Sequence, residues 1–433
     1  MKVGILGGGL TGLTMASFLS ADYEVLEGDS ECGGLCRSIQ EDGFTFDYGG
    51  AHIIFSRNQR PVEFMTKTLG ENCVRGRRNN KVFFKGRFVK YPFENGLSDL
   101  PQEDNFECLY YYLKNDYPEP NNFKEWIYHT FGKGIAEKYL VPYNEKIWNY
   151  DTAKMSLHWV AGRVPQPPLE DVIKSAIGIQ TEGYTHQLYF YYPETGGIQA
   201  LIRAMESKIP NIHRNFRVTT VEKRGKKWLV SSGKEEREFD ELVSTIPIFD
   251  LVKALGNVPQ TVLTALNSLR FNSLIAVMLG LNEPRINEFT AVYFPDKDFL
   301  PNRVGFPMNF SERNVPPGMS SLVAEITSNE GDGIWELSND DIIERVSAGL
   351  HQRKIIDRGR ICYSKVMRSK YAYVVYDLSY QKNIRLVRDY IDKLGIRLCG
   401  RFAEFEYLNM DACIDRGMAK AELMNRLNAH TGE

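Results

Sequence analysis

Three glycines near the start of the chain have the spacing of a phosphate-binding turn. Gly7, Gly9 and Gly12 form a Gly-x-Gly-x-x-Gly pattern directly after the apolar run Val3 to Leu6. In such a turn the first glycine allows a tight bend, the second lets a pyrophosphate approach the backbone, and the third lets the helix pack on the strand. The free N–H groups at the start of the following helix then attract phosphate.

Glu27 adds an acidic group at the distance that a dinucleotide-binding turn requires. It ends the predicted strand Tyr23 to Glu27, twenty residues after Gly7. A carboxylate at that place can accept hydrogen bonds from the two hydroxyls of a ribose. A chance glycine turn in an α/β domain is the alternative. The agreement of strand, turn, helix and acidic strand end favours a dinucleotide site.

Two further glycine pairs follow, Gly33-Gly34 and Gly49-Gly50. They suit a long, flat cofactor that lies along the backbone, and the choice of FAD over NAD rests on the resemblance given below. Cys32 and Cys36 flank the first pair, but a metal site needs more ligands nearby, so we expect no bound metal. His52 is the only one of the seven histidines in such a loop. It is either an active-site group or a structural hydrogen-bonding residue.

Two arginines and three aromatic residues in the rest of the chain could bind a ligand. Arg303 and Arg401 are predicted at strand ends, where their guanidinium groups could bracket a pyrophosphate bidentately. Tyr373 and Tyr407 could stack on a ligand or donate hydrogen bonds to phosphate, and Trp148 could lie against the face of a ligand ring. Taken singly, such arginines are more often ordinary surface residues and such aromatic residues more often part of the core.

The composition is that of an ordinary globular protein and narrows the possible partners. The chain has 433 residues, 43% hydrophobic and 25% charged, which fits two or three domains. A net charge of -2 provides no basic excess, so we expect no nucleic-acid partner. No segment approaches the ~20 apolar residues of a membrane span. Seven scattered cysteines indicate reduced thiols and a cytoplasmic protein, and a homo-oligomer stays open.

The candidate residues need a mixed scaffold of strands and helices to bring them together. After the strand–turn–helix start, residues 81–91 read as a hairpin and residues 104–185 as mostly helical. The later predicted elements are strands at 216–219 and 228–230, an antiparallel sheet within 272–330, and a last helix that starts near Asp411.

The strand–turn–helix start and the later elements predict an α/β fold, and the family resemblance given below implies a Rossmann-like FAD-binding domain built from discontinuous segments. An inserted helical domain and an antiparallel β-sheet substrate domain should cover the cofactor, with a cleft between the three parts. The expected boundaries are 1–78, 187–252 and 386–433 for the FAD-binding domain, 96–186 for the helical domain, and 79–95 and 253–385 for the substrate domain.

Several segments resemble known flavoproteins. The loop Asp29 to Ser38, the Asp47-Tyr48-Gly49-Gly50 element and the segment Tyr192 to Gly197 are similar to those of the FAD-binding amine oxidase and protoporphyrinogen oxidase group. Within that group, the chain resembles the eukaryotic-type UDP-galactopyranose mutase family from residue 4 to about residue 415. The matching segments are Asp47 to Ser56, Lys90 to Asn95, Tyr143 to Trp148, Lys154-Met155, Trp159 to Arg163, Tyr293 to Pro295 with Arg303, Lys370 to Asp377, and Gly400 to Phe402 with Tyr407.

The resemblance implies a non-redox flavoenzyme, an isomerase that interconverts the pyranose and furanose forms of a UDP-sugar such as UDP-galactose. Reduced flavin N5 would attack the anomeric carbon after an external reductant, such as NAD(P)H, has reduced the FAD. An FAD-dependent oxidase or dehydrogenase of the amine oxidase or protoporphyrinogen oxidase type is the alternative. A flavin protein that binds partners without catalysis is a third possibility.

The resemblance also assigns residues to the site. The catalytic residues would be His52, Arg303 and Arg401. The substrate would contact Tyr91, Asn144, Trp148, Arg163, Gln187, Tyr293, Tyr373 and Tyr407. The cofactor would contact Gly7, Gly9, Gly12, Glu27, Gly34, Leu35, Ser38, Gly50, Val218, Gly400 and Asp411.

Two residues depart from the pattern of the family. Glu94 stands where the family has a glutamine, and Phe310 stands where it has a tyrosine that contacts phosphate. A carboxylate beside a diphosphate is unfavourable unless it is protonated or turned away. These two positions leave the exact sugar nucleotide open.

Overall fold

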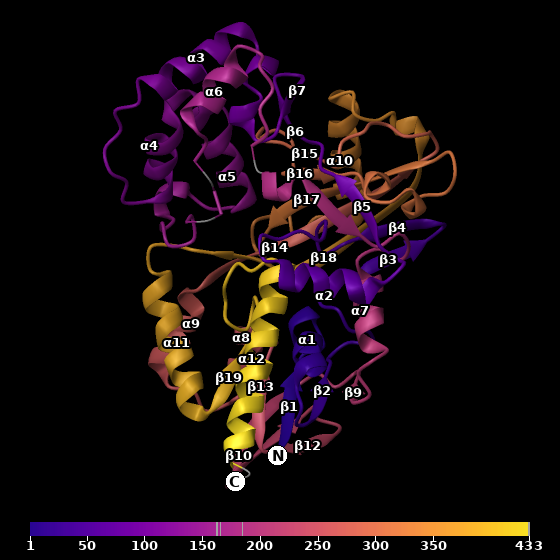
Figure 1. Cartoon of the computed structure of the whole chain (residues 1–433), viewed down its shortest axis with the longest axis vertical. Coiled ribbons are helices and arrows are strands. Elements are labelled where there is room, and N and C mark those ends of the chain that lie inside the picture. The colour runs from indigo at the N-terminus through magenta and orange to yellow at the C-terminus, as the bar shows by residue number, and fades with distance from the viewer. Residues whose placement is uncertain (162, 165, 184, 432–433) are drawn as a thin grey trace.

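A five-stranded parallel sheet is the scaffold of the lower part of the protein in Figure 1. The computed structural model describes residues 1–161, 163–164, 166–183 and 185–431. The sheet has the strand order β19-β13-β1-β2-β9, and its neighbouring strands are parallel. Its strands are β1 (Lys2–Leu6), β2 (Asp22–Leu26), β9 (Ile212–His213), β13 (Glu241–Ser244) and β19 (Ile396–Leu398).

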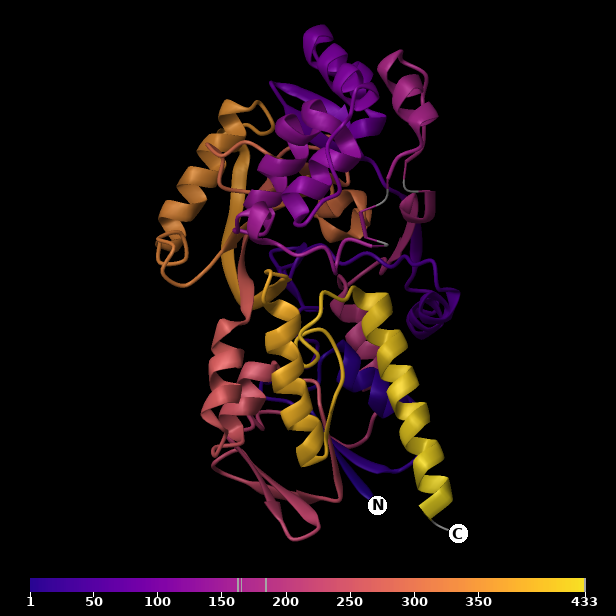
Figure 2. The same ribbon diagram turned by 90° about the vertical axis from the view of Figure 1, so that its left-hand side faces the viewer.

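Helices cover both faces of this sheet, because parallel strands that are apolar on both sides must be buried on both sides. Val3, Ile5 and Val25 pack in one core with α1, α7 and α12, whereas Leu242 and Leu398 pack in another with α8, α9 and α11. Figure 2 shows α9 and α11 well separated from α12. The helices of this part are α1 (Leu10–Phe18), α2 (Gln59–Leu69), α7 (Gln199–Glu206), α8 (Ile248–Ala254), α9 (Gln260–Ser268), α11 (Tyr380–Leu394) and α12 (Met410–Thr431).

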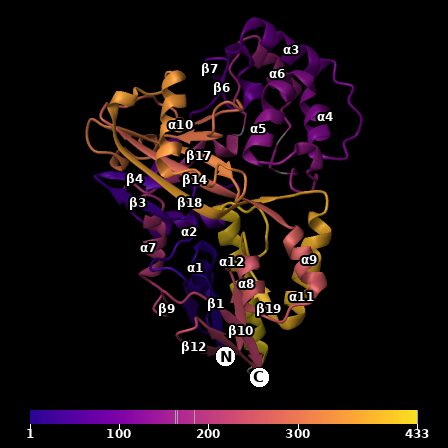
Figure 3. The same cartoon turned by 180° about the vertical axis from the view of Figure 1, so that it is seen from behind.

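A seven-stranded sheet forms the second part, on the side of α10 (Asn339–Gln352) (Figures 1 and 3). Its order is β18-β14-β17-β16-β15-β6-β7, and all neighbours are antiparallel except the parallel pair β15 and β6. The predicted hairpin at residues 81–91 is confirmed and forms one edge of this sheet. The strands are β6 (Asn80–Phe84), β7 (Arg87–Lys90), β14 (Arg270–Leu281), β15 (Ala291–Tyr293), β16 (Arg303–Gly305), β17 (Ser320–Ser328) and β18 (Ile361–Val375).

The third part is helical, as the sequence predicts, and lies beside the seven-stranded sheet (Figure 3). Asn122 caps the second of its helices, because its side chain accepts a hydrogen bond from the backbone N–H of Glu125 at 3.0 Å. The helices are α3 (Gln102–Leu113), α4 (Phe123–Ile135), α5 (Val141–Ile147) and α6 (Leu169–Ala176).

Three small sheets complete the fold. They are the pair β3 (Ser38–Glu41) and β4 (Phe44–Asp47), the pair β5 (Val74–Arg77) and β8 (Tyr189–Tyr192), and the group β10 (Thr220–Arg224), β11 (Lys227–Ser231) and β12 (Glu236–Phe239). The predicted α/β fold with a helical part and an antiparallel sheet is confirmed. Among the described residues, no helix is both long and apolar enough to cross a membrane.

The strand predicted at residues 216–219 is wrong, since β10 begins only at Thr220. The backbone N–H groups of Asn215 and Phe216 instead donate to the carbonyl oxygens of Asp29 and Glu27, at 2.9 and 2.8 Å. The segment 216–219 therefore packs against the loop that follows β2 as irregular backbone and is not part of a β-ladder.

Glu94 is a buried carboxyl group between the hairpin β6–β7 and the helical part. It lies in the short 3-10 helix Phe93–Asn95, and only 4% of it is exposed. Burial raises its pKa from 4.5 to about 7. The expected conflict with a diphosphate is therefore avoided, because this carboxyl group lies inside the fold.

This burial makes the stability of the protein depend on pH. The folded protein holds the Glu94 proton more tightly than the unfolded chain does, so the free energy of unfolding should fall as the pH rises from 4.5 to about 7. The pKa difference corresponds to a loss of at most about 3 kcal/mol. Glu94→Gln has no carboxyl group to titrate at this position, so its free energy of unfolding should not show this decrease. Its thermal unfolding midpoint should therefore decline less than that of the wild type between pH 5 and pH 8. Equal declines in the two proteins would contradict the assignment.

Candidate functional site

A cleft of about 1470 Å³ is lined by segments of all three parts. Its walls include the turn after β1, the loops after β2 and β4, residues 216–219, and strand residues of the seven-stranded sheet. Among the described residues, ten lysines and arginines but only four aspartates and glutamates line it. The cleft therefore has a positive potential, which attracts an anionic ligand even though the whole chain is slightly acidic.

The glycine turn has the geometry that a bound pyrophosphate needs. Gly7 adopts a φ of +103°, a backbone conformation that residues other than glycine rarely adopt. A Cβ on Gly12 would lie 2.0 Å from the carbonyl oxygen of Gly7, so α1 packs directly on the turn. A Cβ on Gly9 would meet no atom within 4 Å, although Gly9 lines the cleft. The turn thus leaves empty the space beside Gly9 that phosphate would fill, and these residues fit a dinucleotide cofactor.

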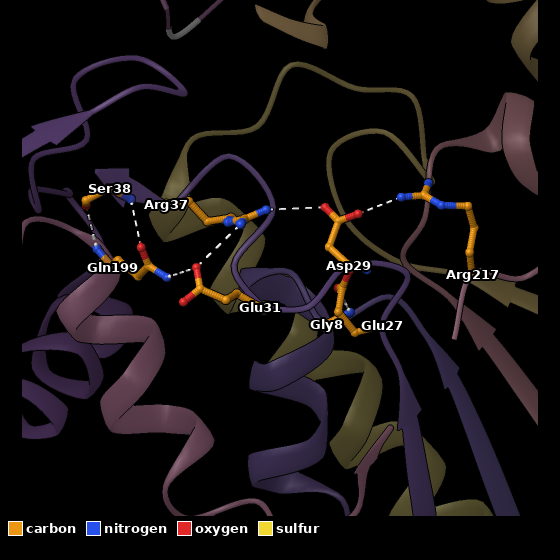
Figure 4. Close-up of polar contacts among 8 residues, drawn as sticks. All are labelled: Gly8, Glu27, Asp29, Glu31, Arg37, Ser38, Gln199 and Arg217. Carbon is orange, nitrogen blue, oxygen red and sulfur yellow. Dashed lines mark hydrogen bonds and ion pairs between the residues drawn. The ribbon is translucent and has the colours of Figure 1, made fainter. Parts of the chain in front are cut away.

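Glu27 is held in place by the backbone around it (Figure 4). Its two carboxylate oxygens accept hydrogen bonds from the N–H groups of Gly8 and Asp29, both at 2.8 Å. Burial raises the pKa of Glu27, and the two hydrogen bonds oppose that rise. A carboxylate offers about four acceptor positions, so Glu27 keeps capacity for ribose hydroxyls at the edge of the cleft.

An ion-pair bridge lies next to Glu27 and joins two walls of the cleft. Asp29 pairs with Arg37 at 3.3 Å and with Arg217 at 2.5 Å, as the dashed lines in Figure 4 show. Arg37 belongs to the loop with Gly33 and Gly34, whereas Arg217 comes from the wall of residues 216–219. The two loops that flank the predicted ribose site are therefore tied together by one carboxylate.

Ser38 does not line the cleft, although the sequence placed it at the cofactor. Its hydroxyl donates to Asp47 at 2.6 Å and accepts from the N–H of Gln199 at 3.1 Å. Asp47 also accepts from the Tyr192 hydroxyl and the Ile198 N–H, and burial raises its pKa to about 6. Ser38 thus belongs to a buried polar network that supports the cofactor loops from behind.

His52 lies in the wall of the cleft as a neutral imidazole. Its Nδ1 is 2.6 Å from the carbonyl oxygen of Gly50, which can only accept, so Nδ1 carries the proton. Burial lowers the pKa of His52 to about 4, and the charges of Arg401 and Arg303 act in the same direction. The bare Nε2 is then a hydrogen-bond acceptor at neutral pH.

Arg303 and Arg401 line the same cleft but are held differently. Arg303 forms an ion pair with Glu325 through Nη2. Arg401 donates instead to two backbone carbonyls, those of Leu408 at 3.0 Å and of Ala372. In each guanidinium group Nε is buried and has no partner among the described residues. A guanidinium group has five N–H donors, and the contacts named here use one of Arg303 and two of Arg401, so further Nη hydrogens remain for a ligand in the cleft.

Tyr407 lies between two arginines. Its ring centre is 4.6 Å from the guanidinium carbon of Arg401 and 4.8 Å from that of Arg163. The ring of Tyr373 lies 5.4 Å from the same Arg401 carbon. Such contacts between cations and ring faces fix the direction of each guanidinium group. These four residues, which the sequence predicted for the site, come together in the cleft.

Trp148 and Asn144 lie behind this cluster and do not line the cleft. Trp148 is 4% exposed, and its ring meets those of Tyr373 and Tyr407 edge-on, with ring centres 6.1 and 5.7 Å apart. Its indole N–H donates to Asn144 at 3.1 Å. The two residues thus support the tyrosines from behind.

Tyr91 and Tyr293 form another wall of the cleft, with ring centres 4.8 Å apart. Gln187 accepts a hydrogen bond from Arg78 at 2.7 Å. Arg78 lines the cleft, and no motif in the sequence distinguished it from other surface arginines. Phe310 also lines the cleft, where its ring packs on Tyr192 and carries no hydroxyl for phosphate.

The predicted residues can thus be divided by position. The predicted residues that line the cleft are Gly7, Gly9, Glu27, Gly34, Leu35, Gly50, His52, Tyr91, Arg163, Gln187, Val218, Tyr293, Arg303, Tyr373, Arg401, Tyr407 and Asp411. Gly12, Ser38, Asn144, Trp148 and Gly400 lie behind its walls. Within the described part of the chain, no group of three or more His, Cys, Asp or Glu side chains could hold a metal ion.

Two glycine substitutions should separate the fold from the cofactor site. Gly9→Val should fold with little loss of stability but lose the flavin, because its side chain enters the space beside the turn. Gly12→Ala should destabilise the protein by about 2 kcal/mol or more, because its Cβ meets the Gly7 carbonyl. Flavin content after denaturation and urea unfolding of both variants would test this. A flavin-loaded Gly9→Val protein would contradict the placement of the cofactor.

Comparisons with known proteins agree on the fold. The crystal structure of reduced UDP-galactopyranose mutase superimposes with a TM-score of 0.90 and 25% identity, covering 98% of this chain and 96% of that chain. A protein from Exiguobacterium sp. 255-15 with a protoporphyrinogen oxidase assignment gives a TM-score of 0.77 at 18% identity, covering 98% of each chain. Cyclohexylamine oxidase from Brevibacterium oxydans IH-35A gives 0.69 at 13% identity and 99% coverage of each chain.

The sequence comparisons give a short relative and a family. An uncharacterized protein in the nifH2 3' region of Methanothermococcus thermolithotrophicus is 45% identical over 65 residues, which are 14% of this chain, and the match spans 62% of that relative. The family model for flavin containing amine oxidoreductase matches residues 10–425. Because this match spans nearly the whole chain, the protein belongs to the flavin containing amine oxidoreductase family.

Proposed function

We propose that the protein binds FAD and interconverts the pyranose and furanose forms of a UDP-sugar such as UDP-galactose. The observation that carries this proposal is the pair of arginines, Arg303 and Arg401, which line the same cleft as the glycine turn. The glycine turn can bind the pyrophosphate of FAD by itself, so two cationic forks elsewhere in the cleft suit a second ligand that carries its own diphosphate. The likeness to the solved UDP-galactopyranose mutase supports the same substrate class.

Bound in its reduced form, FAD would supply a nucleophilic nitrogen, N5, toward the anomeric carbon of the sugar. The protein would contribute by holding the diphosphate and the sugar in one orientation beside the cofactor. We further propose that an external reductant such as NAD(P)H brings the cofactor to this state.

Arg401 is the principal cation for the diphosphate. No carboxylate lies within ion-pair distance of it in the described part of the chain, so its charge is not cancelled by the protein. The departing nucleoside diphosphate gains negative charge as the bond to the sugar breaks. A guanidinium group fixed beside it stabilises that charge without reorganising.

Tyr373 and His52 would supply hydrogen bonds of opposite kinds. Burial raises the pKa of Tyr373 far above neutral pH, so its phenol stays protonated and can donate to phosphate or to a sugar hydroxyl. The neutral His52 offers Nε2 as an acceptor. The two residues thus orient a ligand that has both donors and acceptors.

The charge of the cleft weighs against the main alternative, an oxidase that acts on amines. An amine substrate is a cation near neutral pH, and a cleft lined by ten basic and four acidic described residues repels it. An oxidase whose substrate carries carboxylates remains compatible with this charge.

The test of the function is turnover of a nucleotide sugar by protein in two redox states. Dithionite-reduced protein should convert UDP-galactofuranose to UDP-galactopyranose, and oxidised protein should not, as chromatography of the products would show. The flavin should not be consumed during turnover, since there is no net redox change. Peroxide formation with an amine and no sugar product would instead identify an oxidase.

Removal of the Arg401 side chain should impair catalysis while leaving the flavin bound. Arg401→Ala should lower kcat/KM by about 30- to 1000-fold, because a charged hydrogen-bonding partner of the leaving group is lost, at about 2–4 kcal/mol. Arg401→Lys should recover only part of the lost kcat/KM, because the ammonium group of lysine cannot form the paired hydrogen bonds of a guanidinium group. Arg385→Ala removes one charge from the exposed surface of α11 and is the matched control. If UDP binds Arg401→Ala as tightly as the wild type, the diphosphate assignment fails.

A further inference from the structure

Glu325 is a carboxylate at the site that no motif in the sequence indicated. It lies on β17 directly opposite Arg303 on β16, and its side chain is 1% exposed. Oε1 pairs with Arg303 Nη2 and also accepts a hydrogen bond from the N–H of Ala51 at 3.2 Å. The carboxylate therefore joins the arginine to the loop that carries Gly50 and His52.

This pairing changes the charge that Arg303 presents to a ligand. Burial alone would lower the pKa of Arg303, but the Glu325 carboxylate together with Tyr373 and Tyr293 raises it well above its ordinary value, so the guanidinium stays charged. The pair as a whole is neutral. Arg401 is bound by carbonyl oxygens, so it keeps a full positive charge in the cleft.

The pair is also incomplete as a hydrogen-bonded unit. Glu325 Oε2 and Arg303 Nε are both buried and have no partner among the described residues. Oε2 lies 3.9 Å from the place where a Cβ on Gly50 would stand, on the side where glycine leaves room. Burial of a carboxylate costs desolvation free energy, so we expect a buried carboxylate beside an arginine that would bind an anion to have a function.

We propose that Glu325 orients Arg303 and cancels its charge, so that the site prefers a nucleotide sugar to the free nucleoside diphosphate. This inference rests on the proposed function. A UDP-sugar carries about two negative charges, whereas UDP carries nearly three above pH 6 because its terminal phosphate ionises a second time. Because Glu325 cancels the charge of Arg303, the cleft offers one net positive charge fewer to the additional negative charge of UDP. Glu325 thus limits occupation of the site by UDP alone.

Glu325→Gln is the variant that isolates the charge. The amide oxygen can still accept from Ala51 and Arg303, so the geometry is kept while one negative charge is removed. UDP should then gain more affinity than UDP-galactose, and the ratio of their dissociation constants should shift by about 3- to 10-fold in favour of UDP. The shift should shrink at high salt. Arg303→Gln leaves the carboxylate uncompensated and should shift the ratio in the opposite direction.

Two controls separate this effect from general damage. Glu325→Asp keeps the charge and should keep the ratio within about twofold. Glu330→Gln removes a charge from an exposed ion pair with Lys370 and should also leave the ratio unchanged. Flavin content and unfolding midpoints would confirm that the variants fold. If Glu325→Gln does not fold, the double variant Arg303→Gln/Glu325→Gln removes the pair without changing the net charge and should keep the ratio near that of the wild type, whereas a shift as large as that of Arg303→Gln alone would overturn the role of Glu325.

The binding measurements use oxidised, flavin-loaded protein with UDP, UDP-galactose and inorganic pyrophosphate. A shifted ratio in Glu325→Gln supports the role of Glu325, and an unchanged ratio overturns it while leaving the proposed function intact. If pyrophosphate is the only one of the three ligands that the wild type binds, the assignment of a uridine nucleotide fails. In that case, tighter binding of pyrophosphate to Glu325→Gln than to the wild type still supports the cancellation of the Arg303 charge by Glu325. If the wild type binds none of the three, both proposals fail.

Discussion

The close contact between α1 and the turn after β1 determines where the rest of the site lies. Gly12 allows the helix to touch the Gly7 carbonyl, and a Cβ there would be only 2.0 Å from that oxygen. The same helix is approached from the other side by Gly400, where a Cβ would lie 2.7 Å from the Thr11 hydroxyl. Arg401 follows directly, so the cation of the cleft is positioned by glycine contacts against the first turn of α1.

The other arginine reaches the cleft through a second chain of contacts. Lys146 on α5 donates to the carbonyl oxygens of Phe294, Asp296 and Pro301, at 3.0, 2.7 and 2.7 Å. These carbonyls belong to the segment that joins β15 to β16, and β16 begins with Arg303. Burial lowers the pKa of Lys146 to about 7, yet the three acceptors favour its charged form. The helical part is thereby fastened to the strand that presents the arginine.

The sequence was most informative where a local contact requires one residue type. Gly7 and Gly12 could be predicted because the protein's own backbone and side chains leave no room for a Cβ there, and Gly9 because the expected pyrophosphate needs the space beside it. Glu325 could not be predicted, since it is one acidic residue in an apolar strand and its meaning depends on the register of β17 with β16. The placing of Trp148 behind the tyrosines likewise depends on tertiary packing, because a motif match does not distinguish a residue that lines a cleft from one that supports it.

The strand order of the parallel sheet has a consequence for how the protein acquires its site during synthesis. β1 lies between β2 and β13, while β19, which pairs with β13 and leads to Arg401, follows almost 400 residues after β1. At ribosomal rates of about 5–20 residues per second, roughly 20–80 seconds separate the two strands. β13 itself precedes β19 by about 150 residues, so for roughly 8–30 of those seconds the outer edge of β13 has no partner, and the glycine turn faces a cleft that lacks one wall. A nascent chain can therefore form the first contacts for the cofactor long before it can hold a diphosphate.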